Sequence, residues 1–119
     1  MKFMLLLFAF SLPGAAASIS GDSVYQLKSR WQDQSGKSFE LSSLRGTPVV
    51  AAMAYTSCRS SCPWIVEGMK KIEGDLARSG RKATFLLGAC DSRRDTPAQL
   101  KKFAAEHGLD PARWKLLHG

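Results

Sequence analysis

Several features that would place this chain in a specialised class are missing. Its 119 residues contain no long internal repeat, heptad run or low-complexity tract, and no apolar stretch of the roughly 20 residues that cross a bilayer comfortably. There is no second cysteine pair and no histidine pair to complete a four-ligand zinc site. What remains is an ordinary globular composition, 45% hydrophobic and 23% charged. That composition argues against a disordered chain or a multi-span membrane protein and leaves room for one domain.

The N-terminus has the pattern of an export signal. Lys2 precedes an apolar run, Phe3–Leu12, and the small residues Ala15–Ala17 follow. A basic start, a short apolar core and an Ala-x-Ala site are typical of a secretory signal peptide. We therefore expect a signal peptide at residues 1–17 and a domain at residues 18–119 in the bacterial periplasm, where disulfides persist. An uncleaved run would instead tether the protein to the inner membrane.

Continuous apolar runs predict the strands of the main domain. Val49–Tyr55 and Ala83–Cys90 have no polar alternation, which is typical of strands covered on both faces. Trp114–Leu117 predicts a short third strand. In front of them, Val24–Leu27 alternates as a half-buried strand does, and a turn follows at Gln34–Lys37. With Phe39 and Leu41 on its second strand, this segment predicts a small N-terminal β-hairpin.

Each gap between the main strands carries the signals of a helix. Pro63 favours the first position of a helix that runs to about Ser79. Its apolar stripe comprises Ile65, Met69, Ile72 and Leu76. A second helix begins with Thr96 as N-cap and Pro97 as first residue, and its stripe comprises Leu100, Phe103 and Ala104. The order strand, helix, strand, helix, strand predicts an α/β fold with parallel pairing, in which the carboxyl ends of the strands share one edge.

All three cysteines fall at that carboxyl edge. Cys58 and Cys62 form a C-x-x-x-C loop before the first helix, and Cys90 ends the second strand. The helix dipole and the charge of Arg59 should lower the pKa values of the loop thiols. Two soft sulfurs on a short loop can bind Cu(I) or oxidise to a disulfide. A purely structural disulfide across so short a loop would add only about 2 kcal/mol, so the pattern favours metal or redox use.

Several motifs resemble the Sco/SenC family. Tyr55–Pro63 is similar to the copper loop of that family, and Asp91–Pro97 matches its D-x-x-R-D-T-P segment. Leu44–Gly46 and the Trp-x-Leu-Leu run at Trp114–Leu117 match as well. The resemblance covers residues 21–119. It implies a thioredoxin-like fold in which the D-x-x-R-D-T-P turn packs beside the copper loop.

The resemblance also implies a copper-binding metallochaperone in which Cys58 and Cys62 bind copper. The implied partner is the copper-site (CuA) subunit of cytochrome c oxidase, or another copper or thiol protein whose cysteines the chain prepares. The third ligand of the family is a histidine in a later Asp-His-Ser segment, which this sequence does not contain. The usual C-terminal hairpin and helix are also missing. We therefore expect a partial, C-terminally truncated thioredoxin-like domain over residues 18–119.

Two alternatives stay open for the same cysteine pair. The first is a periplasmic thiol-disulfide oxidoreductase, an enzyme that uses Cys58 and Cys62 for exchange. The second is an inactive truncated product. The net charge of +7 is scattered, and without stacking aromatics or a reading helix it excludes nucleic acid as a partner. The scattered charge is expected to form a solvated surface, with an acidic protein or an anionic membrane surface as the alternative partner.

The remaining polar residues have mainly structural interpretations. Cys90 is expected to be a small buried hydrophobe, with a third sulfur beside the pair as the alternative. His118 is expected to be structural, with replacement of the missing histidine as the minor alternative. Asp91 and Asp95 are expected to shape the turn and to cap the second helix.

Overall fold

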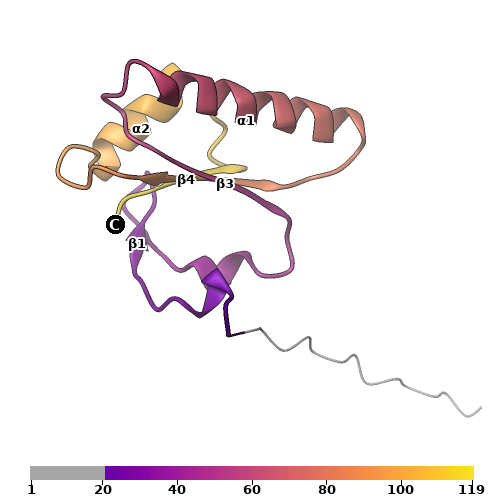
Figure 1. Cartoon of the computed structure of the whole chain (residues 1–119), viewed down its shortest axis with the longest axis horizontal. Helices are drawn as coiled ribbons and strands as arrows, with labels where there is room; N and C mark the ends of the chain where they lie inside the picture. The colour runs from indigo at the N-terminus through magenta and orange to yellow at the C-terminus, as the bar shows by residue number, and fades with distance from the viewer. Residues whose placement is uncertain (1–20) are drawn as a thin grey trace, which may run out of the picture.

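The computed structural model describes residues 21–119, so the signal peptide expected at residues 1–17 lies outside the described part. Its main sheet has the order β3-β4-β5, and both strand pairs are parallel. Helices α1 and α2 alternate with the strands and lie together over one face of the sheet (Figure 1). The bounds are β3 Val49–Ala54, α1 Ser61–Arg78, β4 Thr84–Ala89, α2 Pro97–Glu106 and β5 Trp114–Leu117. The predicted order of elements and the parallel pairing are confirmed.

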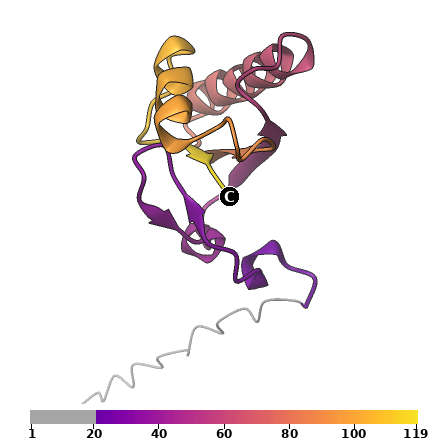
Figure 2. The same ribbon diagram turned by 90° about the vertical axis from the view of Figure 1, so that its left-hand side faces the viewer.

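A smaller N-terminal segment packs on the opposite side of the sheet from the helices (Figure 2). It contains an antiparallel hairpin with the short strands β1 (Trp31–Gln32) and β2 (Ser38–Phe39). The turn predicted at Gln34–Lys37 joins them. Two 3-10 turns flank this hairpin, η1 (Val24–Gln26) and η2 (Leu41–Leu44).

The predicted hairpin is present, but both strands differ from the prediction. The second strand ends at Phe39, and Leu41 begins η2 instead. Val24–Leu27 was expected to be extended, and most of it forms η1 instead. The Ser23 hydroxyl accepts a hydrogen bond from the Tyr25 N–H at 3.3 Å, which bends the chain at this point. The strand begins later, at Trp31–Gln32. A short polar side chain before the alternating residues therefore overrode their strand pattern.

The core lies between the sheet and the two helices. Phe85 of β4 stacks on Trp114 of β5 with ring centroids 4.9 Å apart, and both side chains are almost fully buried. The predicted stripe of α2 is confirmed as buried. In α1 most of the predicted stripe is confirmed, because Met69 is buried and both Ile65 and Leu76 pack against the core. Ile72 is 42% exposed instead, and Val66, outside the predicted stripe, is fully buried.

The other face of the sheet is only partly covered. β3 was predicted to be buried on both sides, and this prediction was wrong, because Ala51 is exposed and Met53 is 54% exposed. The N-terminal segment leaves an apolar cavity of about 440 Å³ over this face. Within residues 21–119, no helix is long and apolar enough to cross a membrane.

The two edges of the sheet differ in how their backbone groups are satisfied. Next to β5, Gln32 and His118 exchange two backbone hydrogen bonds of 2.8 Å. The buried Gln34 amide donates to the Trp114 carbonyl at 2.8 Å and accepts from the Leu116 N–H at 3.0 Å. The hairpin thus closes the β5 edge, whereas in the described part of the chain no strand pairs with the outer edge of β3.

Candidate thiol and metal site

The carboxyl ends of β3 and β4 bring two loops together. One loop runs from Tyr55 to the start of α1 and carries Cys58, and the other follows β4 and begins with Cys90. The Cys90 N–H donates to the Ala54 carbonyl at 2.9 Å, so the end of β4 is fixed to the end of β3. All three cysteines therefore lie on the carboxyl side of the sheet, as the sequence predicted.

Helix α1 begins earlier than predicted. Its first residue is Ser61, so Pro63 is the third residue rather than the first. Proline is tolerated there because the first N–H groups of a helix have no partner within the helix. As a consequence, Cys62 belongs to the first turn of the helix instead of standing just before it.

The sulfur of Cys58 accepts a hydrogen bond from a backbone N–H at the start of α1. The Cys62 N–H donates to Cys58 Sγ at 3.4 Å, while the N-cap Ser60 makes no capping bond with its side chain. The hydroxyls of Ser60 and Ser61 each lie 3.8 Å from the same sulfur. Cys58 thus takes the place of a capping oxygen, and the positive end of the helix favours its thiolate.

The two loop thiols differ in ionisation. The hydrogen bonds from Cys62, first from its side chain and then from its backbone, lower the pKa of Cys58 to about 5. Burial raises the pKa of Cys62, and the hydrogen bond with Cys58 adds to this. The lowered pKa that we predicted is therefore confirmed for Cys58 and wrong for Cys62. Arg59 is exposed and is not among the main causes for either thiol.

Tyr55 also contributes to the lowered pKa of Cys58, which its place in the sequence did not predict. A side-chain hydrogen bond with Cys58 raises the pKa of Tyr55 and helps to lower that of the thiol. Tyr55 is 41% exposed, at the point where β3 ends. The available signal is a phenol three residues before Cys58, at the start of the segment that resembles the copper loop, but no separate role was predicted for it.

Thr56 fastens the same loop to the turn after β4. The carboxylate Oδ1 of Asp95 accepts hydrogen bonds from the Thr56 N–H at 3.1 Å and from its hydroxyl at 2.6 Å. Asp95 also shapes the turn as predicted, since its N–H donates to the Asp91 carbonyl at 2.8 Å. It does not cap α2; that bond comes from Thr96, whose hydroxyl accepts from the Gln99 N–H.

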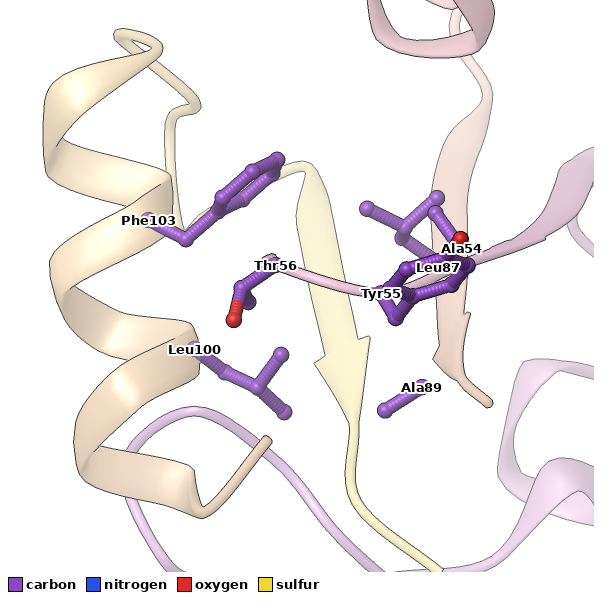
Figure 3. Close-up of a pocket in the computed structure, with 7 residues that line it drawn as sticks. All are labelled: Ala54, Tyr55, Thr56, Leu87, Ala89, Leu100 and Phe103. Atoms are coloured by element: carbon purple, nitrogen blue, oxygen red, sulfur yellow. The ribbon is translucent and has the colours of Figure 1, made fainter. Parts of the chain in front are cut away.

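The base of the cysteine loop is closely packed. Thr56 lines a cavity of only about 10 Å³, and Figure 3 shows its side chain between the sheet and helix α2. Leu100 and Phe103 line the cavity from the helix side, and Leu87 from the sheet. This space admits no more than about one water molecule. The first residues of the loop are therefore closely packed against the sheet and α2.

Neither Cys90 nor His118 joins the pair as a further ligand. Cys90 is exposed, so its expected role as a buried hydrophobe is wrong, although its charge adds to the raised pKa of Cys62. His118 Nδ1 donates to the Asp95 carbonyl at 2.9 Å. Within residues 21–119, no three His, Cys, Asp or Glu side chains are grouped so that they could hold a metal ion.

The two cysteine sulfurs are donors that suit a soft metal ion. Soft thiolates select Cu(I), whereas structural zinc takes four ligands. Cys58 supplies a stabilised thiolate and Cys62 a second sulfur four residues on, so the residues fit a two-sulfur Cu(I) site.

A parallel sheet with helices on one face and a cysteine loop entering the first helix defines a thioredoxin-like thiol protein. A sequence model described as SCO1/SenC matches residues 21–113. The chain belongs to the SCO1/SenC family.

Individual relatives agree with this assignment. The SCO1 protein homolog of Bacillus subtilis (strain 168) is 33% identical over 89 residues, which are 75% of this chain and 46% of that protein. BsSco, a Sco-family cytochrome c oxidase assembly protein with a disulfide switch, has a TM-score of 0.68 and 32% identity, covering 76% of this chain and 52% of its own. Copper-bound ScoI of Bradyrhizobium japonicum has a TM-score of 0.65 and 28% identity, covering 76% and 55%. The chain thus spans about half the length of these relatives.

Proposed function

We propose that this protein is a copper-binding metallochaperone that carries Cu(I) on Cys58 and Cys62. The observation that carries the proposal is the 3.4 Å hydrogen bond from the Cys62 N–H to Cys58 Sγ, which sets a thiolate at the start of α1 beside a second sulfur. Family membership and the copper-bound relative from Bradyrhizobium japonicum support copper as the cargo.

The environments of the two sulfurs suit transfer rather than permanent storage. Cys58 is partly exposed and can meet an incoming thiolate, whereas Cys62 is buried behind it. An acceptor thiolate would exchange first with Cys58, so that copper passes from one pair of sulfurs to another. The acceptor that we propose is the CuA subunit of cytochrome c oxidase, reached from the periplasm after export. The description of BsSco as an oxidase assembly protein supports this acceptor.

A second function is favoured by the same asymmetry. In thiol-disulfide exchange, the Cys58 thiolate would attack a substrate disulfide and release one substrate thiolate. After Cys62 loses its proton, its sulfur would attack Cys58 Sγ and release the second thiolate. The substrate gains two electrons, and the loop is oxidised to the Cys58–Cys62 disulfide. The disulfide switch of BsSco supports this alternative.

A Cu(I) titration of the reduced protein against a competing chelator tests the main proposal. We expect one Cu(I) per chain. Loss of an outer-shell contact lowers metal affinity by about 10- to 100-fold, so losing a ligand in Cys58→Ser or Cys62→Ser should lower it by about 100-fold or more. Cys90→Ser is the matched control and should bind as the wild type does.

A single-turnover assay with glutathione disulfide separates the two functions. A chain that binds no Cu(I) but reduces one equivalent of disulfide, with formation of the loop disulfide, would replace the chaperone by the oxidoreductase. A chain that does neither would contradict both proposals.

A further inference from the structure

A buried carboxylate lies directly under the cysteine loop. Asp95 is 0% exposed. Its Oδ1 accepts both hydrogen bonds from Thr56, whereas its Oδ2 is buried with no hydrogen-bond partner. The nearest arginine in sequence, Arg94, pairs instead with Asp91 at 3.8 Å, and no ion pair of Asp95 occurs within residues 21–119.

Such a group opposes stability rather than adding to it. Burial of a polar atom without a hydrogen-bond partner costs free energy, and Oδ2 of Asp95 is such an atom. A buried polar group that lacks a partner calls for a specific explanation. The contacts of Asp95 place that explanation at the cysteine loop.

Asp95 connects the ends of two strands that are not neighbours. On one side it accepts hydrogen bonds from Thr56, two residues after the end of β3. On the other side its carbonyl accepts from His118 Nδ1, just after β5. The backbone of His118 is itself fixed by its two bonds to Gln32. Asp95 therefore links the residues that follow β5 to the first residues of the cysteine loop.

The hydrogen bonds between Asp95 and Thr56 also restrict the position of Cys58. Only one residue separates them, and the Cys58 N–H donates to the Tyr55 carbonyl at 3.1 Å, which closes a tight turn around Thr56. Because the turn includes both residues, holding Thr56 in place also holds Cys58 Sγ in place. The sulfur must reach the start of α1 to receive the Cys62 N–H.

We propose that Asp95 is a positioning residue of the cysteine loop, which acts through Thr56 to hold Cys58 Sγ against the start of α1. The consequence for copper rests on the function proposed above. The consequence for the reactivity of Cys58 does not, because it holds for the metal-free protein.

Alkylation of the metal-free, reduced protein by iodoacetamide at pH 5.5 tests this directly. Trypsin cuts after Arg59, so Cys58, Cys62 and Cys90 are read on separate peptides. Asp95→Ala removes both bonds to Thr56. Thr56→Val removes only the 2.6 Å hydroxyl bond at nearly constant shape, and Thr56→Ser keeps it. We expect Asp95→Ala and Thr56→Val to slow the reaction of Cys58 severalfold, and Thr56→Ser to restore it.

A loss of stability alone must not produce this result. Gln34→Ala removes a buried side chain with two hydrogen bonds to β5 and does not touch the loop. We expect it to lower the unfolding midpoint and leave Cys58 alkylation unchanged. Folded Thr56→Val protein that reacts at the wild-type rate would overturn the proposal, even if Asp95→Ala does not fold.

A Cu(I) titration of the same variants gives the second measurement. Loss of an outer-shell contact typically lowers metal affinity by 10- to 100-fold, and we expect about 10-fold for Thr56→Val. Wild-type protein that binds no Cu(I) would end the chaperone proposal, while the alkylation rates would still decide the role of Asp95. Unchanged affinity in a variant with slowed alkylation would overturn the copper consequence alone.

Discussion

Cys58 and Cys62 belong to one short loop, yet the fold gives them opposite environments. Cys58 is partly exposed and surrounded by hydrogen-bond donors, and the pKa of its thiol falls to about 5. Cys62 is 4% exposed within the apolar core, and burial raises its pKa. The difference arises because α1 begins at Ser61, which draws Cys62 into the core and leaves Cys58 to satisfy the helix end. The Cys58 sulfur is thus an accessible thiolate, whereas the Cys62 sulfur is a buried thiol.

The largest expected difference between the two sulfurs is in alkylation rate. At pH 5.5 most of Cys58 is thiolate, whereas almost none of Cys62 is, and the thiolate is the nucleophile. A thiolate of lower pKa is intrinsically weaker, with a Brønsted slope of about 0.4–0.5, which offsets part of this advantage. Since Cys62 is also buried, we expect iodoacetamide to modify Cys58 at least about 10-fold faster at pH 5.5.

The dependence of the two alkylation rates on pH should also differ between Cys58 and Cys62. The Cys58 rate should fall as the pH drops through about 5 and should level off above that value. The Cys62 rate should still be rising in alkaline solution, because its pKa is raised. Peptide mapping after timed quenching measures both rates in one sample. Equal rates at pH 5.5, or parallel profiles, would contradict the asymmetry.

Substitution of Cys62 should reduce the free energy of unfolding more than substitution of Cys58 does. Cys62→Ser buries a hydroxyl in the apolar cluster, so we expect the free energy of unfolding to fall by about 1–2 kcal/mol. Cys58→Ser changes a partly exposed site and should stay within about 0.5 kcal/mol. Urea unfolding of the reduced proteins measures both. Cys62→Ala is the control, because it removes the sulfur without adding a polar group. Similar losses for both serine variants would show that Cys62 is not an anchor.

The fold was predictable from sequence wherever apolar runs were long and flanked by clear start signals. β4 and the capped helix α2 are examples. Prediction failed where contacts distant in sequence decided the outcome. Met53 lies in a run that is typical of a doubly covered strand, yet its outer face is bare because the N-terminal segment covers only part of the sheet. No local pattern in β3 carries that information.

The position of the site was predictable from the sequence, but its detailed geometry was not, because it depends on contacts between residues distant in sequence. The spacing of Cys58 and Cys62 located it, but the start of α1 at Ser61, which separates their pKa values, differs from the start that Pro63 predicted. The bond between Thr56 and Asp95 joins residues 39 positions apart. The family resemblance implied that the two segments lie side by side, but the hydrogen bond between these two side chains is seen only in the folded chain.

Cys90 offers the smallest and most selective test of the comparison. Its charge adds to the raised pKa of Cys62 and is not among the main causes for Cys58. We therefore expect Cys90→Ser to move the alkylation profile of Cys62 modestly to lower pH and to leave that of Cys58 in place. Stability should hardly change, because the side chain is exposed. Copper stoichiometry should also stay at one, and its loss in this variant would make Cys90 a third ligand, ending the two-sulfur site.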